Sequence, residues 1–404
     1  MEFYTYTLPN GIRGIHRQVR STVAHCALVI GAGSRDEHPG QYGLAHLTEH
    51  AFFKGTERRR AWQVNCRLEN LGGELNAFTT KEETTIHATT LRGDFAKAAE
   101  LIADIAFRST FPEREIEREK EVIADEINTY KDSPAEMLYD TFEDMLFEGS
   151  ELGHNILGRK AALMRYDGAA IRAFTARTHT TDRMVFSSIG NFSPKTAEAT
   201  ALRYFGEQAA TTRGFERAAP PAVKPFEKTV TKHTHQTHCI IGNRACGIEE
   251  TKRLPLALLV NVLGGPSANS LLNVEVREKH GLSYNIEANY IPYGDSGLVA
   301  IYFSSEHTNE AQCAELVERQ LRRLRTTPLT GRQLSMAKKQ FIAQLAISGE
   351  SNENYMLSAG KSLLTHDEID TMEEVYAKIG ALTAAQLTEA AEEVFTKMSR
   401  LTYK

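Results

Sequence analysis

Two histidines four residues apart, His46 and His50, constrain most strongly how this chain can fold and act. They bracket the segment His-Leu-Thr-Glu-His, whose order is the inverse of the commoner His-Glu-x-x-His helix. On a helix starting near Gly43, both imidazoles lie on one face and can reach one metal ion, with Glu49 beside them. Zinc catalysis needs such nitrogen ligands, an open position for water and a base. The alternative is a helix whose histidines are ordinary core or surface residues.

A second predicted helix offers candidates for the third protein ligand that a catalytic zinc usually has. It opens at Pro112 with acidic residues in its first turn. Glu119 and Glu126 lie two turns apart on its apolar stripe, which they share with Ile123. A buried carboxylate is costly unless it is paired or bound to a metal. The two glutamates therefore predict either a salt bridge to a basic side chain or a metal ligand.

Together, these two segments resemble the inverzincin zinc peptidases, the family of pitrilysin, insulin-degrading enzyme and the mitochondrial processing peptidase. The resemblance rests on His46-x-x-Glu49-His50 followed by Phe-Lys-Gly-Thr, and on Glu119 and Glu126 in an Arg-Glu-Lys-x-Val-Ile-x-x-Glu-Ile context. It extends from about residue 8 to the C-terminal helices. The chain is most similar to short bacterial members, which have half the length of the large clamshell enzymes.

The resemblance implies a role for each of these residues. His46, His50 and Glu126 would bind one Zn²⁺ per chain, Glu49 would be the base, and Glu119 would orient a ligand imidazole. The implied activity is that of a zinc-dependent endopeptidase that hydrolyses short or unfolded peptides in an enclosed chamber. The alternative is a non-catalytic scaffold or partner subunit of the same fold, because some relatives keep the fold and lose the site. Those relatives typically lack part of the five-residue motif, which is complete here.

The second half of the chain contains a further motif of the family. The segment from Arg277 to Tyr284 resembles the signature Arg-Glu-x-x-Gly-Leu-x-Tyr. A guanidinium and a phenolic hydroxyl are suited to anchoring a peptide and stabilising negative charge on the oxygen of its scissile carbonyl. The resemblance therefore makes both residues candidates for catalysis and substrate binding. The alternative is that both only pack. Ser270-Leu-Leu-Asn273 departs from the Ser-Arg-Leu of many relatives, which puts one structural contact near this segment in doubt.

The segment Asn76-Ala77-Phe78-Thr79 resembles the edge strand on which the family binds substrate. An exposed edge can accept an extended peptide as an added strand through main-chain hydrogen bonds, which do not depend on side chains. This mode of binding would explain a broad specificity. The alternative is an ordinary hairpin formed by residues 74–80 and 84–91.

Other histidines are not predicted to bind metal. His154 lies in the loop 152–158, which is close to the family's Gly-x-Pro-x-x-Gly stretch, and we expect it to be structural. His233, His235 and His238 form a cluster, but alternation along a strand directs the first two and the third to opposite faces. Three-way coordination by that cluster is therefore not expected.

The chain is predicted to be an α+β protein of two similar domains, each a mostly antiparallel sheet with helices packed on one face. Residues 1–206 would form the zinc-binding domain, 207–226 a linker rich in proline and polar residues, and 227–404 a zinc-free domain. The halves repeat: residues 23–30 and 236–241 are both apolar strands with a His-Cys pair. The helix predicted at 254–263 would replace the metal helix, and it contains neither His nor Glu.

Composition and charge limit the location and the partners. The net charge of -5 and the pI near 6.3 argue against nucleic-acid binding. Five cysteines without a Cys-x-x-Cys pair disfavour a disulfide framework. No membrane span and no signal sequence are evident, so we expect a cytoplasmic protein without membrane contact, a removed leader being the alternative. The family architecture implies a homodimer in which Arg277 and Tyr284 of one subunit complete the site of the other, although a site within one chain is equally compatible with the domain order.

Overall fold

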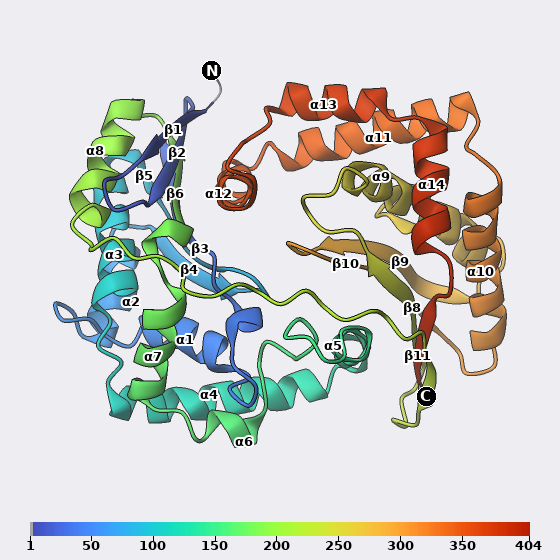
Figure 1. Ribbon diagram of the computed structural model, residues 1–404, viewed down its shortest axis with the longest axis horizontal. Coiled ribbons are helices and arrows are strands. Elements are labelled where there is room, and N and C mark those ends of the chain that lie inside the picture. The colour runs from blue at the N-terminus through green and yellow to red at the C-terminus, as the bar shows by residue number, and fades with distance from the viewer. Residues whose placement is uncertain (1–2) are drawn as a thin grey trace. The chain divides into compact units, whose positions relative to one another are not determined.

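The computed structural model describes residues 3–404, which form two compact units (Figure 1). Unit 1 comprises the chain up to residue 128, residues 154–218 and residues 347–371. Unit 2 comprises residues 129–153, 219–346 and 372–404. Each unit therefore contains segments from both halves of the sequence.

Unit 1 is built on a six-stranded sheet in the order β1-β2-β6-β3-β5-β4. Neighbouring strands are antiparallel except β2 and β6, which are parallel. The central strands β3 and β6 have apolar residues on both faces, as strands covered on both sides require. The strands are β1 (Tyr4–Thr7), β2 (Arg13–Gln18), β3 (Val23–Ile30), β4 (Glu74–Thr79), β5 (Thr84–Leu91) and β6 (Met184–Gly190).

Helices cover both faces of this sheet. Leu28 and Phe186 face the larger apolar core, to which most of the helices contribute. Val29 and Val185 face the opposite way and pack against Leu363 of α12. The helices of unit 1 are α1 (Leu44–Phe52), α2 (Ala61–Glu69), α3 (Phe95–Arg108), α4 (Glu113–Lys131), α6 (Lys160–Leu163), α7 (Gly168–Thr178), α8 (Pro194–Phe205) and α12 (Asn352–His366), with 3₁₀ turns at Ser34–Asp36, Arg92–Asp94 and Thr181–Arg183.

Unit 2 is built on a five-stranded sheet in the order β7-β11-β8-β10-β9. It is antiparallel except for the parallel pair β7 and β11. The strands are β7 (Glu227–Val230), β8 (Thr237–Ala245), β9 (Ser283–Pro292), β10 (Gly297–Ser305) and β11 (Ser399–Tyr403). Because β9 pairs only with β10 within residues 3–404, it forms one edge of this sheet.

Helices also cover both faces of the second sheet. Ile241 and Phe303 face a core formed with α9, α10 and α14. Ile240 and Tyr302 face the other way and pack against Phe142 of α5. The helices of unit 2 are α5 (Pro134–Leu146), α9 (Arg253–Gly264), α10 (Glu310–Thr326), α11 (Gly331–Ser348), α13 (Met372–Ala381) and α14 (Ala384–Val394), with a π-helix at Asn273–Glu278. Two helices cross between units, since α4 ends in unit 2 and α11 ends in unit 1.

The expected α+β class and the internal repeat are confirmed. The strand order β3-β5-β4 of unit 1 recurs as β8-β10-β9 in unit 2, and α1 follows β3 as α9 follows β8. α9 covers the helix expected at residues 254–263, whose sequence contains neither His nor Glu. The prediction that helices pack on one face of each sheet was incomplete, because α12 and α5 cover the second faces.

The division between the units differs from the contiguous domains 1–206 and 227–404 expected from the sequence. α5, from the first half of the chain, packs on the sheet of unit 2, and α12, from the second half, packs on the sheet of unit 1. Residues 207–226, the expected linker, form neither helix nor strand. Its first part is fixed to unit 1, because Arg217 forms an ion pair with buried Asp36, with Nη2 and Oδ2 2.7 Å apart.

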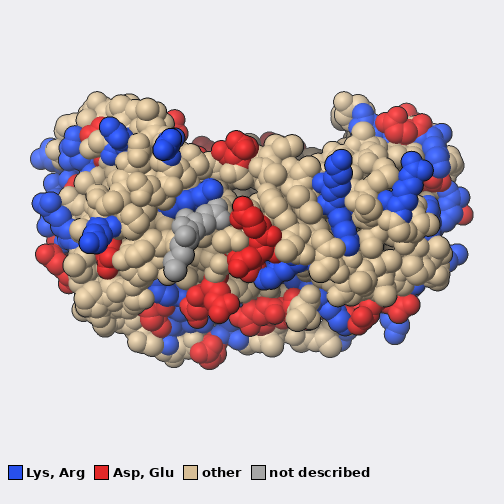
Figure 2. All heavy atoms as spheres, turned by 90° about the horizontal axis from the view of Figure 1, so that it is seen from above, with Lys and Arg blue, Asp and Glu red and all other residues tan. Residues whose placement is uncertain are grey.

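Figure 2 shows acidic and basic side chains interspersed over the face that it presents. No helix within residues 3–404 is long and apolar enough to cross a membrane. All five cysteines are free thiols, and four of them are buried.

Candidate metal centre and active site

Helix α1 presents the two histidines predicted to bind metal. Its apolar residues Leu44, Leu47 and Ala51 are buried in the core of unit 1, which fixes the rotation of the helix. His46 and His50 therefore project together from another side, with ring centroids 4.6 Å apart. This local arrangement follows directly from the four-residue spacing.

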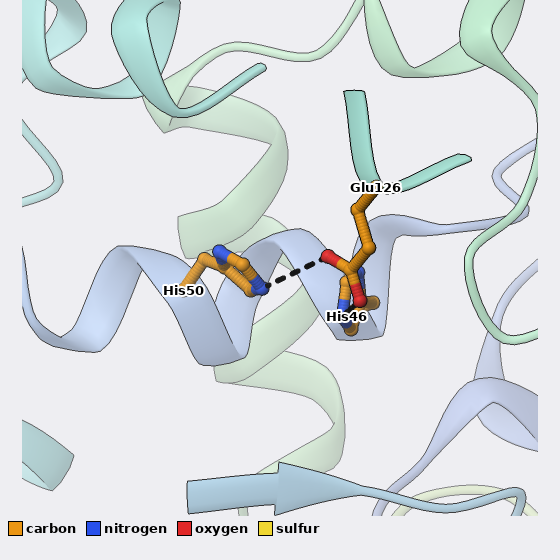
Figure 3. A group of neighbouring side chains, drawn as sticks. All are labelled: His46, His50 and Glu126. Carbon is orange, nitrogen blue, oxygen red and sulfur yellow. Dashed lines mark ion pairs between the residues drawn. The ribbon is translucent and has the colours of Figure 1, made fainter. Parts of the chain in front are cut away.

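Glu126 reaches these histidines from the last turns of α4 (Figure 3). Its Oε1 lies 3.7 Å from Nε2 of His46, and its Oε2 lies 3.7 Å from Nε2 of His50. The three side chains are the one group of possible metal ligands found within residues 3–404, with one ligand atom from each lying within 4.8 Å of the others. Atoms bound tetrahedrally to zinc at about 2.1 Å lie roughly 3.4 Å from one another. The observed separations therefore fit a zinc ion.

The protonation of His46 also suits a ligand. Burial, assisted by the proximity of His50, lowers the pKa of His46 from its ordinary value to about 3. The imidazole is therefore neutral at pH 7, as a metal-binding nitrogen must be. Its Nδ1 is buried and has no hydrogen-bond partner within residues 3–404, whereas Nε2 faces Glu126.

Glu119 holds the second histidine. Its Oε1 lies 2.8 Å from Nδ1 of His50, and its Oε2 lies 2.5 Å from Nζ of Lys54. Burial alone would raise the pKa of Glu119, but hydrogen bonds from His50 and Lys54 lower it below the ordinary value. The carboxylate therefore accepts Nδ1–H of His50, and this bond directs Nε2 towards Glu126.

Glu49 lies beside the metal-binding group and next to β4. Burial raises its pKa, while Thr79 and His50 oppose the rise and Glu126 adds to it. A carboxylate with a raised pKa is better suited to accept and return a proton near neutral pH than an exposed one. Because Thr79 is the last residue of β4, the candidate base lies at the end of that strand.

The predicted substrate strand forms an edge of the sheet. Within residues 3–404, β4 pairs with β5 alone, so its other side is free of strand partners. Ala77 packs against the main core, on the side of α1, whereas the ring of Phe78 contacts that of His87 on the opposite face. Asn76 is exposed on this edge. An extended peptide added to β4 would therefore lie close to Glu49.

Arg277 and Tyr284 come together in unit 2. Arg277 lies in the π-helix and Tyr284 at the start of β9, and the guanidinium carbon is 5.4 Å from the centroid of the phenol ring. Tyr284 is 83% exposed, so most of its side chain is open to solvent. π-helices are rare and often occur at functional sites. The other predicted site residues all belong to unit 1.

Two contributors to the site were not assigned from the sequence. Lys54 lies in the turn just after α1, four residues beyond His50, and supplies the cation that the carboxylate of Glu119 needed. His154, which was expected to be structural, has its Nε2 2.8 Å from Oε2 of Glu37, a residue that accepts backbone N–H groups at the start of α1. No local pattern links His154 to Glu37, because 117 residues separate them.

Comparison with known proteins places the chain in a family. The sequence profile of the insulinase family, peptidase family M16, matches residues 15–160, and that of the peptidase M16 inactive domain matches residues 167–341. A protein of Bacillus subtilis named uncharacterized zinc protease YmxG is 32% identical over 97% of this chain and 95% of its own length. Another of Mycobacterium leprae, uncharacterized zinc protease ML0855, is 28% identical over 97% of this chain and 89% of its own length.

Solved structures share the fold over the whole chain. A structure described as a peptidase M16 inactive domain from Pseudomonas fluorescens superposes with a TM-score of 0.92 at 19% identity, covering 100% of this chain and 98% of that one. A protease from Helicobacter pylori gives a TM-score of 0.90 at 21% identity, covering 100% and 99%. The resemblance seen in the sequence is thus confirmed, and the chain belongs to the insulinase family of peptidases, family M16.

Proposed function

We propose that the protein is a zinc-dependent endopeptidase. The observation that carries the proposal is the convergence of His46, His50 and Glu126 at distances that suit one zinc ion, with Glu49 beside them. The names of the relatives in Bacillus subtilis and Mycobacterium leprae, both zinc proteases, support it. A zinc ion held there would polarise the scissile carbonyl and make a water molecule more acidic.

Each residue of the site has a separate role in the proposed hydrolysis. Glu49 takes a proton from the attacking water and delivers it to the amine that leaves when the peptide bond breaks. Glu119, fixed between His50 and Lys54, holds the imidazole of His50 in the orientation a ligand needs. Neutral His46 requires no proton loss before it binds metal.

The substrate proposed is an extended peptide added to the free edge of β4. Main-chain groups of residues 76–79 would bind it, and this gives affinity without a strict sequence requirement. Only short or unfolded peptides can supply a free extended strand, so folded proteins would be excluded from the chamber proposed by analogy with the family. Arg277 and Tyr284 would bind the peptide and stabilise the negative charge that develops on its carbonyl oxygen.

The proposed assembly is a homodimer in which Arg277 and Tyr284 of the partner complete the site of each subunit. It rests on family architecture and on the assignment of the metal group to unit 1 and of Arg277 and Tyr284 to unit 2. The arrangement within a single chain is the alternative.

A library of quenched fluorescent peptides tests the proposed activity. We expect cleavage of many unstructured peptides, its loss with a chelator such as 1,10-phenanthroline, and its return when Zn²⁺ is added. A non-chelating isomer of phenanthroline is the control for nonspecific inhibition. Cleavage that persists in metal-free protein, or zinc-loaded protein that cleaves no peptide, would refute the proposal.

A further inference from the structure

The first turn of α1, which contains His46, has no cap from its own N-cap residue. That residue is Gly43, which has a left-handed conformation with φ of +94° and no side chain to offer. The carboxylate of Glu37 replaces the missing cap: Oε2 accepts the N–H of Gly43 at 3.1 Å and Oε1 accepts the N–H of Ala45 at 2.7 Å. Two backbone N–H groups at the start of the helix, which have no partner within the helix, thus donate to a side chain six and eight residues earlier in the sequence.

His154 fixes this capping carboxylate. Its Nε2 lies 2.8 Å from Oε2 of Glu37, and its ring stacks on Tyr42 with centroids 4.0 Å apart. Glu37 is 2% exposed and His154 is 9% exposed, so water cannot replace either partner readily. Burial raises the pKa of Glu37 well above its usual range, while the backbone amides of α1 and the nearby Lys81 oppose the rise. A carboxylate at such a position depends on its donors.

The loop that carries His154 also touches the start of α1 directly. A Cβ placed on Gly43 would lie 2.7 Å from the carbonyl oxygen of Leu157, and one placed on Gly158 would lie 2.2 Å from that of Tyr42. Lys81, which lies in the turn between β4 and β5, donates a hydrogen bond from Nζ to the carbonyl oxygen of His154. This bond attaches the loop to that turn. The loop and the helix start are therefore in backbone contact, and neither can shift alone.

We propose that Glu37 and His154 are positioning residues that hold the first turn of α1, and with it the ligand His46, in the geometry that metal binding requires. His46 is the third residue of α1, one position after Ala45, whose amide Glu37 accepts. The inference rests on the proposed zinc site. It assigns a function to a histidine that the proposed mechanism does not use, and it places the effect on metal affinity rather than on the chemical step.

The test compares three substitutions by zinc affinity and by hydrogen exchange of the metal-free protein. His154→Leu keeps the approximate size but removes the hydrogen bond to Glu37, and we expect the zinc dissociation constant to rise about tenfold. Exchange of the amides of Gly43 and Ala45 should become faster in the same variant. His154→Gln restores an N–H donor and should recover most of both effects.

His16→Leu is the matched control. His16 is also buried in unit 1, stacks on Phe192 with centroids 4.6 Å apart, and hydrogen-bonds through both ring nitrogens. Its substitution should lower stability without changing zinc affinity, because it lies on β2 and its hydrogen-bond partners, Ser188 and Phe192, lie on and just after β6. An equal loss of zinc affinity in both leucine variants would show a general loss of stability and overturn the proposal.

Zinc affinity and hydrogen exchange of the variants decide between the possible roles of His154. A folded His154→Leu protein with the zinc affinity of the wild type would overturn the inference. Should that variant fail to fold, Glu37→Gln serves instead, because its single carbonyl oxygen cannot reproduce both caps and the bond to His154, and the same rise in dissociation constant is expected. A wild type that binds no zinc refutes the proposed function, and unchanged exchange of the Gly43 and Ala45 amides in the variants would then refute the positioning role separately.

Discussion

His179 packs behind the metal helix and makes the stability of unit 1 sensitive to acid. Its ring contacts those of Phe52, the last residue of α1, and Phe174, and burial lowers its pKa from 6.5 to about 4. The unfolded chain therefore binds a proton between pH 6.5 and 4 that the folded protein does not bind. The contribution of His179 to the free energy of unfolding is therefore fully present above pH 6.5. It is lost as the pH decreases towards 4, and the loss is about 3 kcal/mol at most.

His179→Phe isolates this contribution. We expect the unfolding temperature of the variant to fall less between pH 7 and pH 4.5 than that of the wild type, because phenylalanine cannot bind a proton. Metal-free protein is required for both, so that loss of zinc in acid does not contribute. Parallel pH profiles for the two proteins would show that His179 is not the titrating group.

The sequence predicted the residues whose positions follow from helical spacing. His46 and His50 converge because four residues make one turn, and Glu119 and Glu126 lie together on α4 because seven make two. The sequence also required a cation for Glu119, and Lys54 supplies it beside His50. That Glu126 rather than Glu119 faces both imidazoles came from the family resemblance, since helical periodicity treats the two alike.

If a substrate peptide binds to the free edge of β4, only some of its backbone N–H groups should contribute to binding. A peptide in a β-ladder directs successive N–H groups alternately towards its partner and away from it. N-methylation of single amides along a good substrate should therefore lower kcat/KM strongly at every second position and weakly between. The comparison series uses alanine substitutions at the same positions, which should have milder effects. A loss that does not alternate along the peptide would argue against binding as an added strand.

Helix α12 depends on a glycine to lie close to the sheet of unit 1. A Cβ on Gly360 would lie 3.0 Å from side-chain atoms of both Ser187 and Val29. Gly360→Leu should therefore displace α12 and destabilise unit 1 by about 1–3 kcal/mol. Hydrogen exchange of β3 and β6 amides should become faster. Ser358→Leu, at an exposed position of the same helix, is the control and should change neither quantity.

The sequence predicted most elements but not the location of α5 and α12. Alternation and helical periodicity identify a strand or a helix and the face it buries, and the repeat indicated which elements correspond. Nothing in an amphipathic helix specifies which sheet it covers. Leu363 packs on Val29, which lies more than 300 residues away along the chain. That α12 packs in unit 1 and α5 in unit 2 is therefore visible only in the three-dimensional structure.

Each unit contains segments from both halves of the sequence. In the proposed dimer, each active site would likewise contain residues from both subunits. A mixture of inactive Glu49→Gln with inactive Tyr284→Phe, under conditions that exchange subunits, tests whether sites form in trans. Each mixed dimer would then contain one site with both residues intact, so random pairing of equal amounts should restore roughly a quarter of wild-type activity. Mixed dimers that form and stay inactive would exclude the trans arrangement and leave the metal assignment unaffected.

One zinc ion bound to His46, His50 and Glu126, with Glu49 as the base, implies that metal content and activity respond differently to two substitutions. The most direct measurement determines bound zinc by mass spectrometry and peptide hydrolysis together for two matched substitutions, Glu49→Gln and Glu126→Gln. We predict that Glu49→Gln retains one zinc per chain and loses turnover, because it removes the base and no ligand, whereas Glu126→Gln loses both. A Glu49→Gln protein without zinc, or a Glu126→Gln protein with wild-type zinc content and activity, would refute the assignment of these residues.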